Sequence, residues 1–158
     1  MLLCSMLQGL PEAAPLNPIA RWVAVFPIVE SLHICGLTLL VGTILILDFR
    51  LLGICLRNQP VSRLAGDLSP WIWTGLAIQL ITGPYLFSGD PSEYVQVSAF
   101  RAKMMFFALA LVYHFTVIRK ATAPTEAATP LGWRRPAALF SLGLWLCVVV
   151  AGMWIGNL

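Results

Sequence analysis

Residues 27–48 read PIVESLHICGLTLLVGTILILD, and this stretch decides the class of fold. It contains only two acidic residues, Glu30 and Asp48, and it is as long as the roughly 20 apolar residues that a helix needs to cross a bilayer. The whole chain has the same character: 59% of its 158 residues are hydrophobic and 11% are charged, and its mean hydropathy is +0.84. A soluble domain has about 25% charged residues. The sequence therefore predicts an integral membrane protein.

Three more stretches, residues 71–88, 99–118 and 136–157, are long and apolar enough to span, and proline or glycine stands near their ends. A short interfacial helix is expected over residues 18–26, because Asn17-Pro18 is a favourable helix start and Arg21 and Trp22 suit the membrane surface. The predicted fold is one all-α domain, an integral membrane four-helix bundle with a short N-terminal interfacial helix.

The basic residues predict how the chain is oriented. Seven lie in the loops after the first and third spans, and three lie on the other side. Basic loops stay in the cytoplasm, so we expect a multi-pass protein of the cytoplasmic membrane with both termini outside. The net charge of +3 is too small and too scattered to predict a nucleic-acid partner. The seven are Arg50, Arg57, Arg63, Arg119, Lys120, Arg134 and Arg135, and the three are Arg21, Arg101 and Lys103.

Ionisable groups within a span are costly and are candidate functional residues. Glu30 and His33 share a face near the outer end of the first span, and Lys103 lies near the outer end of the third. By helical rise His33 is about 9 Å deep, Lys103 about 6 Å and His114 about 22 Å. His33 and Lys103 are therefore expected in one layer with Glu30. Two axial imidazoles of one haem must lie much closer in depth than His33 and His114, so that pairing is disfavoured.

Simpler interpretations stand beside these. His114 can reach the inner interface, Lys103 can extend to the outer headgroups, and Glu30 can favour the helix dipole. Asp48 is expected to pair with Arg50 at the cytoplasmic edge, and Gln79 is a candidate for an interhelical hydrogen bond.

Small residues in the first span suggest close packing. Gly36 and Gly42 either form a seam for a neighbouring helix or leave a gap for a flat ligand beside His33, and the seam is the commoner case. On the third span, Lys103, Phe107, Ala110 and His114 follow helical spacing and form one stripe.

The segments ESLHICG (residues 30–36), DFRLLG (48–53) and FRAK (100–103) resemble a family of small, uncharacterised bacterial four-helix membrane proteins. That family is distantly similar to HemJ-type protoporphyrinogen oxidases and to the membrane domain of CopD-type copper-resistance proteins. Leu32-His33-Ile34 and Lys103 with Tyr113-His114 match the HemJ-type pattern. The resemblance implies a bacterial inner-membrane protein with haem b held by His33 and with Lys103 nearby. The tryptophan and proline-arginine pair of the HemJ first helix have no counterpart, so the oxidase reaction is not implied.

The leading interpretation is a haem b protein near the outer leaflet with an electron-transfer or oxidoreductase role. His33 is the expected iron ligand, Lys103 pairs with a propionate or lies on the distal side, Glu30 orients the imidazole, and Met153 is a candidate second axial ligand. Its expected partners are lipid, haem and a quinone or a periplasmic redox protein, with a homo-oligomer left open.

Two other interpretations remain. One is copper handling by His33 with the soft ligands Cys35, Met104, Met105 or Met153. The other is a membrane subunit or scaffold without a cofactor, whose polar residues serve only assembly.

Overall fold

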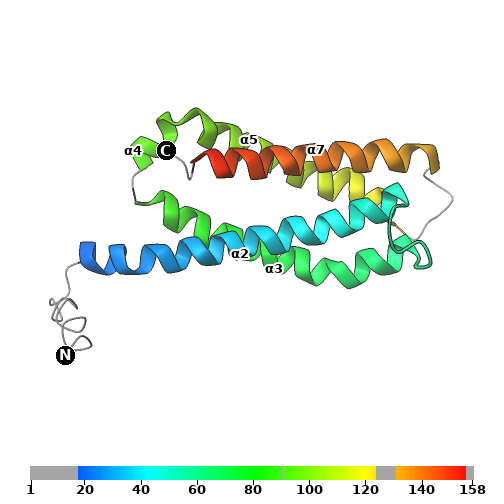
Figure 1. Ribbon diagram of the computed structural model, residues 1–158, viewed down its shortest axis with the longest axis horizontal. Coiled ribbons are helices and arrows are strands. Elements are labelled where there is room, and N and C mark those ends of the chain that lie inside the picture. The colour runs from blue at the N-terminus through cyan, green and yellow to red at the C-terminus, as the bar shows by residue number, and fades with distance from the viewer. Residues whose placement is uncertain (1–17, 90, 124–130, 156–158) are drawn as a thin grey trace, which may run out of the picture.

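The computed structural model describes residues 18–89, 91–123 and 131–155, and within these ranges every secondary-structure element is a helix (Figure 1). The elements in chain order are α2 (Pro18–Leu52), α3 (Val61–Phe87), α4 (Pro91–Gln96), α5 (Ser98–Tyr113), the π-helical turn η1 (His114–Ile118), α6 (Arg119–Ala121) and α7 (Leu131–Ile155).

Three of these helical segments are long and apolar enough to cross a membrane: Val25–Leu52, Ser98–Ala121 and Gly132–Ile155, of 28, 24 and 24 residues. The expectation of an all-helical chain with membrane-spanning helices is confirmed to this extent. The fourth expected span lies in α3, which is less apolar because it carries tryptophans, prolines, threonines and Gln79 between its aliphatic residues.

Three helices begin before the expected spans: α2 begins at Pro18 and not at residue 27, α3 at Val61 and not at 71, and α7 at Leu131 and not at 136. The separate interfacial helix predicted over residues 18–26 is wrong, because α2 runs unbroken from Pro18 through Pro27 to Leu52. Likewise Pro70 lies inside α3 and Pro136 inside α7. A proline removes one helical hydrogen bond, but an apolar solvent offers the backbone no other partner. Helical structure on both sides of the ring is therefore the favoured outcome.

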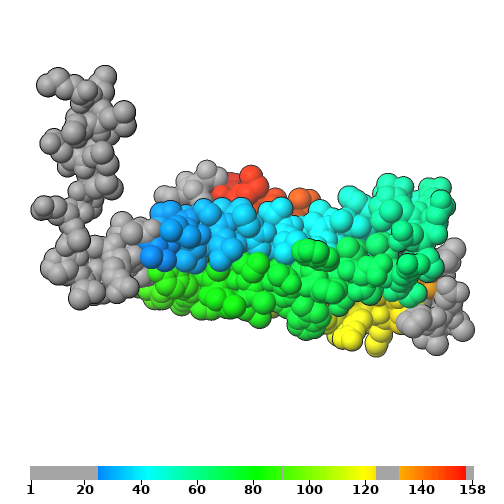
Figure 2. All heavy atoms as spheres, turned by 90° about the horizontal axis from the view of Figure 1, so that it is seen from below, coloured from blue at the N-terminus to red at the C-terminus, as the bar shows by residue number. Residues whose placement is uncertain are grey.

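The long helices form two pairs. α2 packs along α3 and α5 packs along α7, and α2 also contacts α7 and joins the pairs (Figure 1). In the space-filling view, α2 and α3 run side by side along the length of the molecule (Figure 2). Glycines permit this approach. A Cβ on Gly75 would lie 2.8 Å from the backbone nitrogen of Leu40, and one on Gly36 would overlap Ile78.

Of the two glycines expected to form a packing seam on the first span, only one lies at a helix contact. Gly36 lies at the α2–α3 contact, as a packing seam requires, whereas a Cβ on Gly42 would have no neighbour within 4 Å. The seam therefore uses Gly36 from α2 and Gly75 from α3.

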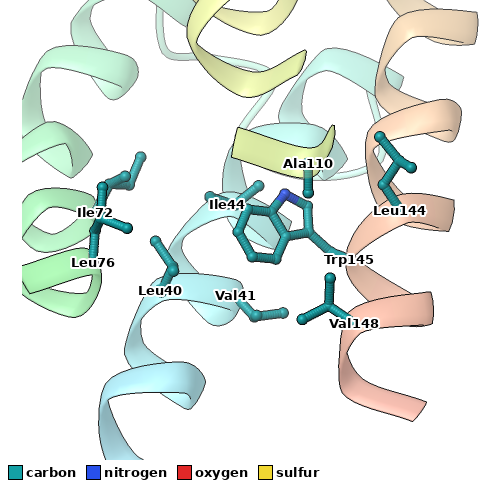
Figure 3. Packing of buried hydrophobic residues seen from close by; sticks show 9 residues of the cluster. All are labelled: Leu40, Val41, Ile44, Ile72, Leu76, Ala110, Leu144, Trp145 and Val148. Atoms are coloured by element: carbon teal, nitrogen blue, oxygen red, sulfur yellow. The ribbon is translucent and has the colours of Figure 1, made fainter. Parts of the chain in front are cut away.

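The buried apolar residues form two clusters. In the larger one Trp145 of α7 lies among side chains of α2 and near Ala110 of α5 (Figure 3). The second cluster lies nearer the α2–α3 loop and includes Leu47, Leu51 and Ile118. The stripe predicted on the third span is the inward face of α5 and η1, since its members Ala110 and His114 are buried and Lys103 and Phe107 are partly buried.

The two ends of the molecule differ in charge. The α2–α3 loop, α6 and the start of α7 lie at one end (Figure 1), which we call the basic end; it carries Arg50, Arg57, Arg63, Arg119, Lys120, Arg134 and Arg135. The opposite end, which we call the His33 end, holds the first half of α2.

One turn of the third span is wider than an α-helical turn. At the end of η1 the backbone N–H of Arg119 donates to the carbonyl of His114, five residues earlier. Such π turns occur mostly as single turns within α-helices and are frequent at functional sites.

Candidate functional site

His33 is held in one orientation by α3. Its Nδ1 lies 2.7 Å from Oγ1 of Thr82, and Thr82 in turn donates its hydroxyl hydrogen to the carbonyl of Ile78 at 2.6 Å. A threonine hydroxyl has one hydrogen, so Oγ1 must accept from Nδ1–H. In the neutral imidazole the hydrogen is then on Nδ1, and Nε2 carries a lone pair. This tautomer is the one that a metal-ligating histidine needs.

The backbone of His33 is fixed as well. Nε2 of Gln79 donates to the His33 carbonyl oxygen at 2.6 Å, so α3 contacts both the side chain and the main chain of this residue. The interhelical hydrogen bond expected of Gln79 is confirmed. Its partner could not be predicted, because it depends on how α2 and α3 align.

Lys103 of α5 completes the layer. Its ammonium is within electrostatic reach of the His33 imidazole. The two residues were expected at one depth, and the structure brings them together. The Lys103 side chain is partly buried.

Two glycines border these side chains. A Cβ on Gly83 of α3 would lie 3.7 Å from Cε1 of His33, and one on Gly152 of α7 would lie 3.6 Å from Nζ of Lys103. The site therefore draws on all four long helices: His33 from α2, Thr82 and Gly83 from α3, Lys103 from α5, and Gly152 from α7.

Several of the other predicted residues lie at the surface of the bundle. Glu30 is exposed, and the hydrogen-bond partner of His33 Nδ1 is Thr82. Met153 is 65% exposed and follows Gly152 on α7. The soft ligands considered for copper, Cys35, Met104 and Met105, are exposed, and no group of three or more His, Cys, Asp or Glu side chains suited to a metal ion occurs within the described ranges.

His114 lies in a different layer from His33. It follows Lys103 by eleven residues, which is about 16 Å of helical rise toward the basic end. Its side chain is 6% exposed and its Nδ1 has no hydrogen-bond partner. A position at a membrane interface does not fit this burial.

Asp48 is where the sequence prediction is wrong. The expected pair with Arg50 does not form: Asp48 is 0% exposed with both carboxyl oxygens unpartnered. Arg50 instead donates to the carbonyl oxygens of Gln59 and Arg57 in the α2–α3 loop. The cause is helix length, because α2 continues for a turn beyond Asp48 and places it in the interior.

The fold and this site define an all-helical chain with three helices that can cross a membrane and a polar layer near one end. The chain belongs to the DUF6644 family, a family of unknown function whose model matches residues 21–158. No curated protein and no solved structure matches the chain.

Proposed function

We propose that this protein is a four-helix membrane protein that binds haem b through His33 near one face of the bilayer and transfers electrons. The observation that carries the proposal is the hydrogen-bond chain from Nδ1 of His33 through Thr82 to the carbonyl of Ile78. It leaves Nε2 as the ring nitrogen with a lone pair, and it fixes the plane of the ring.

The residues around His33 suit a flat, anionic ligand. Gly83 and Gly152 present backbone without a Cβ beside the imidazole and beside the ammonium. Lys103 supplies a positive charge within electrostatic reach of His33, in a layer where a charge without a counter-ion is costly. The carboxylate of a haem propionate would provide that counter-ion.

Haem, when bound, supplies one-electron chemistry. The protein contributes an imidazole whose orientation and basicity are set by Thr82, and a lysine that favours a negatively charged group. The resemblance to HemJ-type and CopD-type membrane proteins supports this class of function. A quinone or a periplasmic redox protein is the proposed electron partner, since the His33 end is the proposed outer end.

The test is the absorption spectrum of the purified full-length protein after expression with sufficient haem. We expect a Soret band that is lost in His33→Ala and largely kept in His114→Ala, because only His33 shares a layer with Lys103. Equal loss in both variants would contradict the assignment of His33 as the one histidine ligand, and would mean that the depths of the two histidines are misplaced or that two chains contribute one histidine each. If the unmodified protein shows no Soret band, the haem proposal is wrong. Bound copper would then favour the copper-handling interpretation, and the absence of copper would favour the scaffold without a cofactor.

A further inference from the structure

The half of the bundle toward the basic end holds a second group of buried polar side chains. Asp48 is fifteen residues beyond His33 on α2, about 22 Å by helical rise. It is 0% exposed, and neither carboxyl oxygen has a hydrogen-bond partner. Ser141 of α7 is 1% exposed and its hydroxyl lies beside this carboxyl without forming a well-aligned hydrogen bond.

Trp145 is a third residue with an unpartnered polar atom. It lies one turn beyond Ser141 on α7, and it packs with Ile44, which lies one turn before Asp48 on α2. Its Nε1 is buried without a partner. In Figure 3 the indole nitrogen is on the side of the ring away from Val41 and Val148. Those two residues lie toward the His33 end, so the N–H points toward the basic end, the direction in which Asp48 and Ser141 lie by helical rise.

No cation neutralises Asp48 in the described part of the chain. From the elements around α2, Tyr113 interacts electrostatically with the carboxyl, but its hydroxyl donates to the carbonyl of Ala137. His114 is buried on η1, and Arg134 on α7 is partly buried with an unpartnered Nε. The remaining charged groups nearby are Arg50, which binds loop carbonyls, and the exposed Arg63, Asp67, Arg119, Lys120 and Arg135.

An ionised carboxylate in such a place carries a desolvation penalty of several kcal/mol unless something compensates it. A metal cation is a poor candidate, because the indole N–H is a donor only and points its positive end into the same layer. A proton removes the charge and turns the carboxyl into a donor for Ser141. The indole N–H of Trp145 and the hydroxyl of Ser141 can then both hydrogen-bond to a water molecule, which donates as well as accepts.

We propose that Asp48, Ser141 and Trp145 form a proton-binding site in which the Asp48 carboxyl holds a proton and exchanges it with water from the basic end. In the exchange the O–H bond of the acid breaks, the proton passes to a water molecule as hydronium, and the carboxylate remains; no oxidant or reductant is involved. The basic end is the nearer one, since Arg134, seven residues before Ser141 on the same face, is already about 10 Å nearer to it.

The site does not depend on haem, and infrared spectroscopy of the full-length protein tests it. At neutral pH we expect the C=O stretching band of a protonated carboxylic acid, shifted on transfer to D₂O because the proton exchanges. Asp48→Asn should remove the band, whereas Asp67→Asn, at an exposed aspartate of α3, should keep it. Ser141→Ala should keep the band but change its frequency, and it leaves the charge of the protein unaltered.

Three results would overturn the proposal: no such band at neutral pH, a band that survives in Asp48→Asn, or a band that stays unshifted in D₂O. Should Asp48→Asn fail to fold, the Ser141→Ala spectrum decides, since an unchanged frequency there would exclude Ser141 from the site.

Discussion

Thr82 is the residue on which the chemistry of His33 depends. Its hydroxyl donates to its own helix and accepts from the imidazole, so one side chain fixes both the tautomer and the direction of the ring. We expect Thr82→Val, which keeps the shape and removes the acceptor, to weaken haem binding about 10- to 100-fold, the usual effect of losing such a partner. Haem titration followed by absorbance measures this.

Thr74→Val is the matched control. Thr74 is on the same helix and also donates to a carbonyl one turn earlier, that of Pro70, but it is exposed and does not contact His33. If both variants bind haem with the affinity of the unmodified protein, the hydrogen bond to Thr82 has no part in ligation.

Substitutions of Lys103 distinguish two roles for this residue, a headgroup anchor and a residue that binds the cofactor. A lysine that only extends to the headgroups should be replaceable by arginine at little cost. Lysine is a compact charge and arginine a planar fork, so a residue that pairs with a propionate should be sensitive to the change. If haem is bound as proposed, we expect Lys103→Arg to insert and fold but to shift the haem midpoint potential. Lys103→Met should shift it further, because a propionate at this place would lose its partner.

A redox titration of both variants beside Arg101→Met measures this, since Arg101 is exposed two residues earlier on α5. If Lys103→Met has the same midpoint potential as the unmodified protein, Lys103 is only a headgroup anchor.

The polar candidate residues of the site could be identified from the sequence alone, but the residues that hydrogen-bond to them could not. His33, Lys103 and Gln79 stand out because each is costly in a membrane span. Thr82 does not, since threonine is common in such helices and bonds its own backbone. Asp48 was misplaced for a different reason: its surroundings depend on a helix end, the least certain feature of any sequence-based assignment.

The helices show why proline is a weak boundary signal in this chain. Pro27, Pro70 and Pro136 all lie inside helices, although in soluble proteins proline often marks an end. Residues that face lipid or protein must keep helical hydrogen bonds, so a kink is favoured over a break. Helix type and order were therefore predictable from apolar length, whereas the first residues of α3 and α7 were not.

The α2–α3 contact is the element whose packing is most easily tested. A Cβ on Gly75 would lie 2.8 Å from a backbone atom of Leu40, so the helices must separate to admit it. We expect Gly75→Ala to lower the stability by about 1–3 kcal/mol, the usual cost of overpacking. Thermal unfolding of the purified protein in detergent measures the change.

Gly66→Ala is the control, because Gly66 is on the same helix and a Cβ there would meet nothing within 4 Å. Alanine is the better helix former, so this variant should unfold at the same temperature or higher. Equal behaviour of the two variants would show that α2 and α3 do not pack closely at Gly75.

At the scale of the whole molecule, the helix order gathers seven basic residues at one end. We expect that end in the cytoplasm and both termini outside. A cysteine placed at Ser62, in a background whose native cysteines are replaced, should react with a membrane-impermeant reagent only after cells are opened. Reaction in intact cells would invert the topology, and with it the assignment of the His33 end as the outer one.

The wide turn at η1 has a consequence for the length of the third span. In an α-helix four residues overshoot a full turn by about 40°, so a buried row of residues spaced by four drifts around the axis. A turn with more residues reverses the drift, and Ala110, His114 and Ile118 all remain buried. The segment thus accommodates one residue more than an α-helical turn. Deleting a single residue between 114 and 118 is expected to leave an ordinary α-helical turn with the two ends in nearly the same phase. Deleting two residues would rotate the Arg119 end by about 100° against the Lys103 end, so chains of this family are expected to tolerate the loss of one residue here far better than the loss of two.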